Sequence, residues 1–150
     1  MPEVPRSGSV GLRIWNAITA ANVALYRASG GRIGAKWKFR NPILLLEHVG
    51  ARSGTRRTSP LVYTPHEDDL LLVASRGGSS KHPGWFHNLR AHPEVTVQVG
   101  RRKLDVTARV ATREERAEVW PMLCEENPDY AAYQKRTDRE IPVIVLSSRP

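Results

Sequence analysis

Residues 95–110 alternate apolar and polar side chains in two runs. Valine occupies every second position of 95–99, and apolar residues occupy every second position of 104–110. Because successive side chains of a strand point to opposite faces, each run predicts a strand with one buried face. Gly100-Arg101 lies between the runs and is typical of a hairpin turn. We therefore expect antiparallel strands to form the framework of the chain.

The other apolar runs predict further strands, without regular crossover helices between them. They cover residues 43–46, 57–64, 70–74 and 142–146. Thr112 and Glu115 form a capping box that opens a helix reaching residue 126, and Pro128 suits the first turn of a second short helix. This order of elements predicts an α+β fold, in which an antiparallel sheet or small barrel carries peripheral helices.

The N-terminal segment carries apolar residues at helical spacing between residues 10 and 28. The pattern predicts an amphipathic helix rather than a membrane span or a secretory signal. Gly30-Gly31 ends the helix, and a basic, aromatic connector follows at 36–40. We expect residues 1–36 to form this helix and its linker, and residues 37–150 to form the main domain. The helix either packs on its own domain or contacts a membrane interface.

The distribution of charge narrows the class of partner. Residues 1–60 contain ten Lys or Arg against two acids, whereas residues 61–150 contain thirteen of each sign, so the first segment carries the net charge of +8. Such a local excess suits an anionic cofactor or an anionic membrane surface. No nucleic-acid-binding motif accompanies it, so we expect no nucleic-acid partner. The single Cys124 excludes an intramolecular disulfide, which fits a reducing cytoplasmic compartment.

Two loops combine glycines, hydroxyls and cationic side chains directly after apolar runs. Residues 50–58 contain two glycines, three hydroxyls and three arginines. Residues 74–81 contain two glycines, three serines, an arginine and a lysine, and the aromatic residues Trp85 and Phe86 follow. Backbone N–H and guanidinium groups bind phosphate or carboxylate, and aromatic faces accommodate a planar ligand. The alternative is an ordinary solvated turn in each case, with Trp85 in the core.

The sequence contains no obvious set of side chains for covalent catalysis. A Gly-x-Ser-x-Gly motif is absent, the five histidines lack the spacing of a metal site, and Cys124 has no adjacent base. Tyr130 and Tyr133 share one face of a short helix and either line a pocket or close the core. We therefore predict no metal site and a reaction carried by a bound cofactor.

Four longer motifs occur together along the chain. They are Gly50-x-Arg52-Ser53-Gly54-x-x-Arg57; Ala74-Ser75-Arg76-Gly77-Gly78 followed by Pro83-x-Trp85-Phe86-x-Asn88-Leu89; Pro128-x-Tyr130-x-x-Tyr133-Gln134; and Thr137-Asp138-Arg139-x-Ile141-Pro142. In this combination the chain, from Trp37 onward, resembles the deazaflavin-dependent nitroreductase family of actinobacteria. Members of that family are split β-barrel proteins, similar to FMN-binding barrels, that use the reduced 8-hydroxy-5-deazaflavin coenzyme F-420.

The resemblance implies coenzyme contacts and a substrate side. The phosphate and acidic tail would be held by Arg52, Ser53, Arg57 and Thr58, with further coenzyme contacts from Gly54 and Pro60. The ring system would be surrounded by Ala74, Ser75, Arg76, Gly77, Trp85, Phe86, His87 and Asn88. The catalytic candidates are Ser75, Tyr130 and Tyr133. The two tyrosines would border the substrate, while Ser75 and Tyr130 would supply a proton or hydrogen bond during hydride transfer.

Several positions depart from the family's usual pattern. Glu47-His48 stands where threonines are common, and Arg76 and Phe86 replace a lysine and a tyrosine but keep the charge and the aromatic ring. Asn127 replaces a frequent tyrosine, which argues against nitroimidazole reduction.

The resemblance implies an oxidoreductase that transfers a hydride from the reduced coenzyme to quinones or other electron-poor acceptors, with nitroaromatics as a further option. The basic N-terminal helix would anchor it peripherally at the inner face of the plasma membrane. Two alternatives are a split-barrel reductase that binds FMN and a deazaflavin carrier without turnover.

Overall fold

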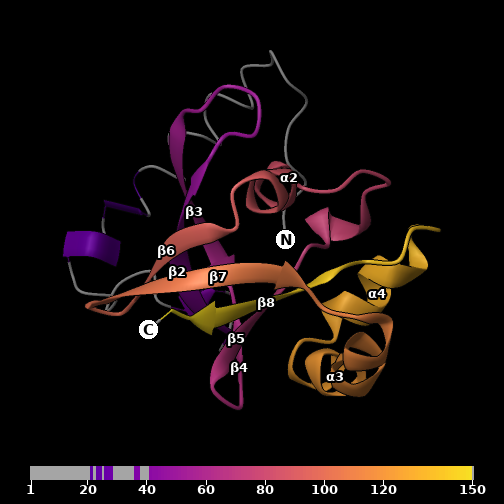
Figure 1. Cartoon of the computed structure of the whole chain (residues 1–150). Coiled ribbons are helices and arrows are strands. Elements are labelled where there is room, and N and C mark those ends of the chain that lie inside the picture. The colour runs from indigo at the N-terminus through magenta and orange to yellow at the C-terminus, as the bar shows by residue number, and fades with distance from the viewer. Residues whose placement is uncertain (1–20, 22, 25, 29–35, 38–40, 150) are drawn as a thin grey trace.

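The fold is an antiparallel sheet that curls on itself and carries helices at its edges (Figure 1). The computed structural model describes residues 21, 23, 24, 26–28, 36, 37 and 41–149. The strands are β1 (Lys36–Trp37), β2 (Asn41–Val49), β3 (Arg56–Val62), β4 (Thr64–His66), β5 (Asp69–Val73), β6 (Glu94–Val99), β7 (Arg102–Val110) and β8 (Val143–Ser148). The helices are η1 (Arg76–Gly78), α2 (Gly84–Ala91), α3 (Arg113–Glu126) and α4 (Asp129–Lys135).

All strand pairs in the described part of the chain are antiparallel. The order is β1-β2-β6-β7-β8-β5-β4, with β3 paired to β2. β3 also approaches β5, so the two ends of the path curl toward each other as in a half-barrel. The β6–β7 hairpin pairs Val97 with Leu104 and turns at Gly100, which has a φ of 61°. The predicted hairpin and antiparallel framework are therefore confirmed.

Both faces of several strands are covered, which explains why their sequences do not alternate. On β2, Leu44 and Leu46 belong to the core inside the curled sheet, whereas Ile43 and Leu45 pack against Tyr26. Similarly, one face of β5 and β8 packs against α3 and α4. Figure 1 shows α3 and α4 side by side near one end of β8, with α2 separate from them. The sheet thus has an inner core and two outer cores.

The segment 57–64, predicted as one strand, is divided between two. β3 ends at Val62, and the Tyr63 N–H donates to the Pro42 carbonyl at 3.1 Å. β4 then pairs with β5 through a turn in which Glu67 has a φ of 53°. Pro65 is tolerated because β4 lies at the edge of the sheet. The single-strand prediction was therefore wrong at this point.

Helix α3 begins at the predicted capping box. The Glu115 N–H donates to Thr112 Oγ1 at 3.2 Å, and the Thr112 N–H donates to Glu115 Oε1 at 3.0 Å. Glu115 also accepts two hydrogen bonds of 2.7 Å from Arg109 on β7. The Arg109 hydrogen bonds hold the pKa of Glu115 at about 2. The cap therefore joins the start of α3 to the sheet.

The predicted helix of residues 10–28 and its linker lie mostly outside the described residues. Those that are described at 21, 23, 24 and 26–28 are helical. The Tyr26 hydroxyl accepts from the Gly100 N–H at 2.7 Å and donates to the Ile43 carbonyl at 3.1 Å. This buried hydroxyl fixes the helical residues to β2 and the β6–β7 hairpin.

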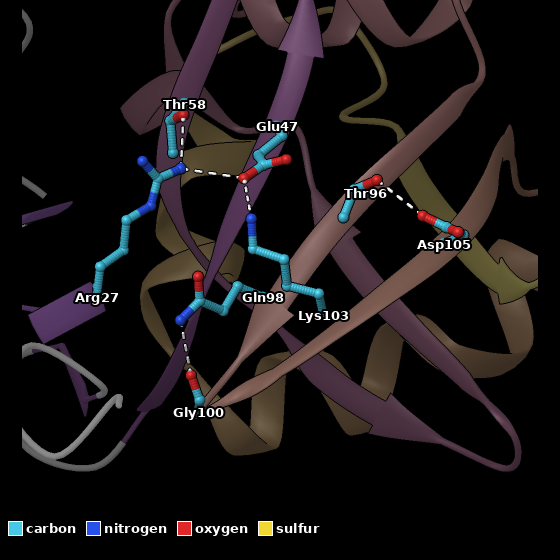
Figure 2. Close-up of polar contacts among 8 residues, drawn as sticks. All are labelled: Arg27, Glu47, Thr58, Thr96, Gln98, Gly100, Lys103 and Asp105. Atoms are coloured by element: carbon cyan, nitrogen blue, oxygen red, sulfur yellow. Dashed lines mark hydrogen bonds and ion pairs between the residues drawn. The ribbon is translucent and has the colours of Figure 1, made fainter. Parts of the chain in front are cut away.

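A polar cluster on the outer face of the sheet includes side chains of β2, β3 and β7 (Figure 2). Glu47 Oε1 accepts from Arg27 at 3.1 Å and from Lys103 at 3.2 Å. The same Arg27 nitrogen donates to Thr58 Oγ1 at 3.3 Å. These contacts are exposed, so each contributes at most about 1 kcal/mol to stability.

Candidate functional site

A cavity of about 1440 Å³ opens between two loops, the strand β3, helix α2 and the start of α4. The first loop connects β2 to β3, and the second connects β5 to α2 through η1. Typical small-molecule pockets measure about 300–1,000 Å³. The cavity therefore has room for an extended ligand.

The cavity is strongly cationic. Its wall contains Arg52, Arg57, Arg76, Lys81 and Arg90, and no Asp or Glu among the described residues. None of these five cations forms an ion pair with a described carboxylate. Guanidinium groups without a protein carboxylate are available to phosphate or carboxylate oxygens, which they bind bidentately. This wall can therefore bind a ligand with several negative charges.

The first loop is held by its own backbone and by α2. The Gly50 N–H donates to the Thr55 carbonyl at 2.9 Å, which closes the turn. The Ala51 N–H donates to Asn88 Oδ1 at 2.8 Å, which ties the loop to α2. Arg52 is left exposed on the cavity wall.

Arg139 holds the second loop through its carbonyl groups. Its guanidinium donates to Ser75 O and Ser79 O at 2.9 Å each, and to Ala74 O at 3.3 Å. One planar side chain with several donors thus fixes the backbone of the whole loop.

The second loop also contains an unusual run of positive φ angles. Arg76, Gly77 and Gly78 have φ values of 45°, 64° and 82°. A Cβ added at Gly78 would lie 2.7 Å from the carbonyl oxygen of Tyr133, so only glycine allows this approach to α4. Left-handed backbone at a residue other than glycine is strained, and such strain clusters at ligand sites. The strained Arg76 lies on the cavity wall.

The catalytic candidates Ser75, Tyr130 and Tyr133 reach the cavity from this loop and from α4. Ser75 is only 3% exposed, and its hydroxyl has no protein partner among the described residues. Burial raises the pKa of Tyr130 to about 12. Burial also raises the pKa of Tyr133. Both tyrosines therefore keep their protons near neutral pH.

Helix α2 presents different faces to the cavity and the core. Trp85 is half-buried and lines the cavity, whereas Phe86 is 3% exposed and belongs to the inner core with Leu89. His87 is exposed on the wall. Successive helical residues point about 100° apart, which is why Trp85 and Phe86 face different sides of α2.

His48 connects β2, β3 and α2 beneath the cavity. Its Nδ1 lies 2.9 Å from Asn88 Nδ2, and its Nε2 lies 2.9 Å from Ser59 Oγ. The side chain is 4% exposed. Burial, with a smaller effect from the Arg57 charge, lowers the pKa of His48 to about 4. The imidazole is therefore neutral near pH 7.

The structure brings most of the predicted site residues to one cavity wall. They are Arg52, Ser53, Arg57, Pro60, Ser75, Arg76, Gly77, Trp85, His87, Asn88, Tyr130 and Tyr133. Gly54 lies in an exposed turn outside the wall, and Ala74 and Phe86 are buried in the core. Thr58 faces Arg27 on the outer side of β3 (Figure 2). The roles of the wall residues toward a ligand stay predictions.

Sequence reasoning missed several residues of this site, among them Arg90, Arg139, His48 and Ser59. Arg139 was part of a motif without a role, and His48 was noted only as a departure from the family pattern. Ser59 was overlooked, although residues two apart on a strand share a face and Arg57 was already singled out. That spacing was the available signal for Ser59. Nothing in the spacing of Arg139 points to a loop more than 60 residues away.

Known proteins resemble this chain in sequence and in fold. An F420H(2)-dependent quinone reductase of Mycobacterium tuberculosis is 42% identical over 129 residues, which are 84% of this chain and 87% of that protein. A solved F420-H2 dependent reductase is 44% identical with a TM-score of 0.65, over 71% of this chain and 94% of that one. A heme storage protein from Vibrio cholerae, 12% identical with a TM-score of 0.55, shares the fold over 87% of this chain and 89% of that one.

The sequence profile described as F420H(2)-dependent quinone reductase matches residues 19–148, which is most of the chain. The resemblance to deazaflavin-dependent enzymes and the predicted α+β split-barrel class are both confirmed. The chain belongs to the F420H(2)-dependent quinone reductase family.

Proposed function

We propose that this protein is an oxidoreductase that transfers a hydride from reduced coenzyme F-420 to quinones or other electron-poor acceptors. The observation that carries the proposal is a cavity with five cationic side chains, no described carboxylate and an aromatic wall, in a chain of this family. The reduced coenzyme supplies the hydride when it is bound. The protein binds it, orients it toward the acceptor and supplies hydrogen bonds.

The cavity wall fits a ligand with an anionic part and a planar part. Arg52 lies in the first loop and Arg57 follows it on β3, and both would hold the phosphate and the acidic tail. Trp85 and Pro60 provide apolar surface for the ring system. The donors and the flat surface belong to one continuous cavity, as an extended coenzyme requires.

Ser75 and Tyr130 are the proposed hydrogen-bond donors during hydride transfer. Both reach the cavity, and burial keeps Tyr130 protonated well above neutral pH because its pKa is about 12. A neutral donor held in place stabilises negative charge that develops in the transition state. No strong base is required of either residue.

A quinone is the proposed acceptor, as the names of the relatives suggest. Asn127 lines the cavity near Tyr130 and Tyr133, and its amide supplies polar groups without an aromatic face. We therefore place nitroaromatic compounds second, as acceptors that the wall orients less well.

The test separates this function from its two alternatives. Purified protein is titrated with reduced coenzyme F-420 and with reduced FMN, and binding is followed by fluorescence quenching. Oxidation of each is then followed after addition of menadione. Binding and oxidation of the deazaflavin are expected. Binding without oxidation would indicate a carrier, and tight binding of FMN alone would overturn the proposal.

We further propose a cytoplasmic protein with peripheral contact to anionic membranes. The support is the excess of positive charge in residues 1–60 and the lipid solubility expected of quinone acceptors. Among the described residues, no helix has the length and apolar character needed to cross a bilayer. In liposome flotation, the full chain should bind anionic vesicles more tightly than the variant Arg6→Gln with Arg13→Gln. Equal, weak binding would exclude the contact.

A further inference from the structure

The backbone N–H of Ala51 determines which atoms donate and which accept in the hydrogen bonds around His48. The Ala51 N–H can only donate, so the Asn88 atom 2.8 Å away is the acceptor oxygen Oδ1. The Asn88 amide nitrogen, which can only donate, therefore faces His48 Nδ1 at 2.9 Å. The orientation of this amide follows from its partners.

The same reasoning assigns the proton of the imidazole ring. Because Nδ1 accepts from Asn88, the neutral ring carries its proton on Nε2. Nε2 lies 2.9 Å from Ser59 Oγ and donates to it. His48 is thus held in one tautomer by two fixed partners.

The Ser59 hydroxyl is left with a proton to donate. Its oxygen accepts from His48, and no other described residue hydrogen-bonds to it. Ser59 lies on β3 and lines the cavity together with His48 and Arg57. The hydroxyl proton can therefore be donated into the cavity, to an acceptor oxygen of a bound ligand.

We propose that His48 and Asn88 are positioning residues that present the Ser59 hydroxyl as a hydrogen-bond donor to an acceptor oxygen of the bound coenzyme. The proposal rests on the proposed function for the identity of the ligand. The acceptor is a phosphate, carboxylate or carbonyl oxygen, because each of these accepts a hydrogen bond and none can donate one. A donor whose direction is set before binding loses little rotational freedom when the ligand arrives.

The same Asn88 amide also holds the first loop through Ala51. The three segments that surround this end of the cavity, β3, the first loop and α2, are therefore joined by one chain of hydrogen bonds. His48 is the link between Asn88 and Ser59, so removing its ring breaks this chain of hydrogen bonds between α2 and β3.

The first test reads the tautomer in the protein without ligand. Long-range ¹H–¹⁵N NMR of the histidine rings at pH 7 should show His48 with a proton on Nε2 and none on Nδ1. A proton on Nδ1, or a doubly protonated ring, would overturn the proposal. This measurement does not depend on what the cavity binds.

The second test is a double-mutant cycle on the dissociation constant of reduced coenzyme F-420, measured by fluorescence quenching without acceptor. Ser59→Ala and His48→Asn should each weaken binding about tenfold. His48→Asn added to Ser59→Ala should have little further effect, because the hydroxyl that His48 positions is gone. His48→Gln serves as a second variant if His48→Asn does not fold.

The controls are His92→Asn and Ser148→Ala, which change an exposed histidine at the end of α2 and an exposed serine at the end of β8. Both should leave the dissociation constant unchanged. If the wild type binds but Ser59→Ala binds equally well, or if the two effects simply add, the positioning role is wrong. If the wild type does not bind the coenzyme, the proposed function fails and this inference fails with it, whatever the tautomer.

Discussion

Ser75 combines burial with a hydroxyl that no described residue uses. Such a group can donate to a ligand without breaking a hydrogen bond of the fold. Replacing Ser75 by Ala should lower the rate of hydride transfer about 10- to 100-fold, because one fixed donor to the developing charge is lost. The dissociation constant should change less than about threefold, since most binding contacts are retained.

Single-turnover oxidation of the bound, reduced coenzyme by menadione measures the rate of hydride transfer directly. Ser148→Ala is the matched control, because it removes an exposed hydroxyl outside the cavity. A rate within twofold of the wild type in Ser75→Ala would remove Ser75 from the mechanism.

His48 makes the stability of the protein depend on pH in a defined window. Its pKa is about 4 in the folded chain, against 6.5 for an ordinary histidine. Between these values the unfolded chain binds a proton that the folded chain does not, so stability falls as pH decreases from 6.5 to 4. The slope is at most about 1.4 kcal/mol per pH unit for this one group.

Urea unfolding at several pH values measures this slope. His82 also has a pKa lowered by burial, so the wild type must be compared with His48→Gln rather than interpreted alone. The difference between the two proteins should shrink as pH falls through the window. A constant difference would show that His48 is protonated equally in both states.

Individual residues were predictable only where their neighbours in sequence carried the signal. Arg52 and Arg57 were found because they share a short loop with glycines and hydroxyls. His48 was not assigned a role, since its partners lie 11 and 40 residues away. The polarity of its hydrogen bonds depends on those long-range contacts, which spacing along the chain does not encode.

At the scale of elements, helix α2 places Trp85 on the cavity wall and Phe86 in the core. Trp85→Ala should weaken coenzyme binding at least about tenfold and cost stability as well, because the indole also packs partly against the core. Phe86→Leu should destabilise the protein by about 1 kcal/mol and leave binding unchanged, because Phe86 lies in the core. Thermal unfolding and fluorescence titration of both variants measure the two effects. Equal losses of affinity would mean that α2 has no dedicated cavity face.

The loop at η1 owes its shape to one side chain from a distant segment. Replacing Arg139 by Lys keeps a positive charge but removes the planar set of donors that reach Ala74, Ser75 and Ser79. Hydrogen exchange followed by mass spectrometry should show faster exchange at residues 74–79, with the β6–β7 hairpin unchanged. Unchanged protection of the loop would mean that its backbone is held by η1 itself.

Elements with strong local signals were predictable, and those set by sheet edges were not. The alternation of 95–110 and the capping box at Thr112 each matched the structure. The break between β3 and β4 did not, because a strand can leave one neighbour and join another without a turn signal. There the Tyr63 N–H bonds to the Pro42 carbonyl, and that partner lies on a strand far back in the chain.

For the whole molecule, the position of the positive charge says more about the class of ligand than the net charge does. The net charge of +8 alone is compatible with nucleic acid, membrane or an anionic coenzyme. The structure places five cationic side chains on one cavity wall without a described carboxylate. Meanwhile the described Arg27 and Lys103 are paired with Glu47 on the outer face (Figure 2). Five described cations without an ion pair are thus gathered on one wall, while others, such as Arg101, lie outside it.

This concentration predicts how coenzyme binding responds to salt and to mutation. Raising NaCl from about 50 mM to about 500 mM should weaken binding several-fold, because ions screen the attraction. Arg57→Gln should weaken binding at low salt and flatten this dependence. Arg101→Gln removes the same charge from an exposed turn outside the cavity wall, so its affinity and salt dependence should match the wild type. If the two variants behave alike in fluorescence titrations, the coenzyme responds to net charge, and the cavity wall is not the source of the attraction.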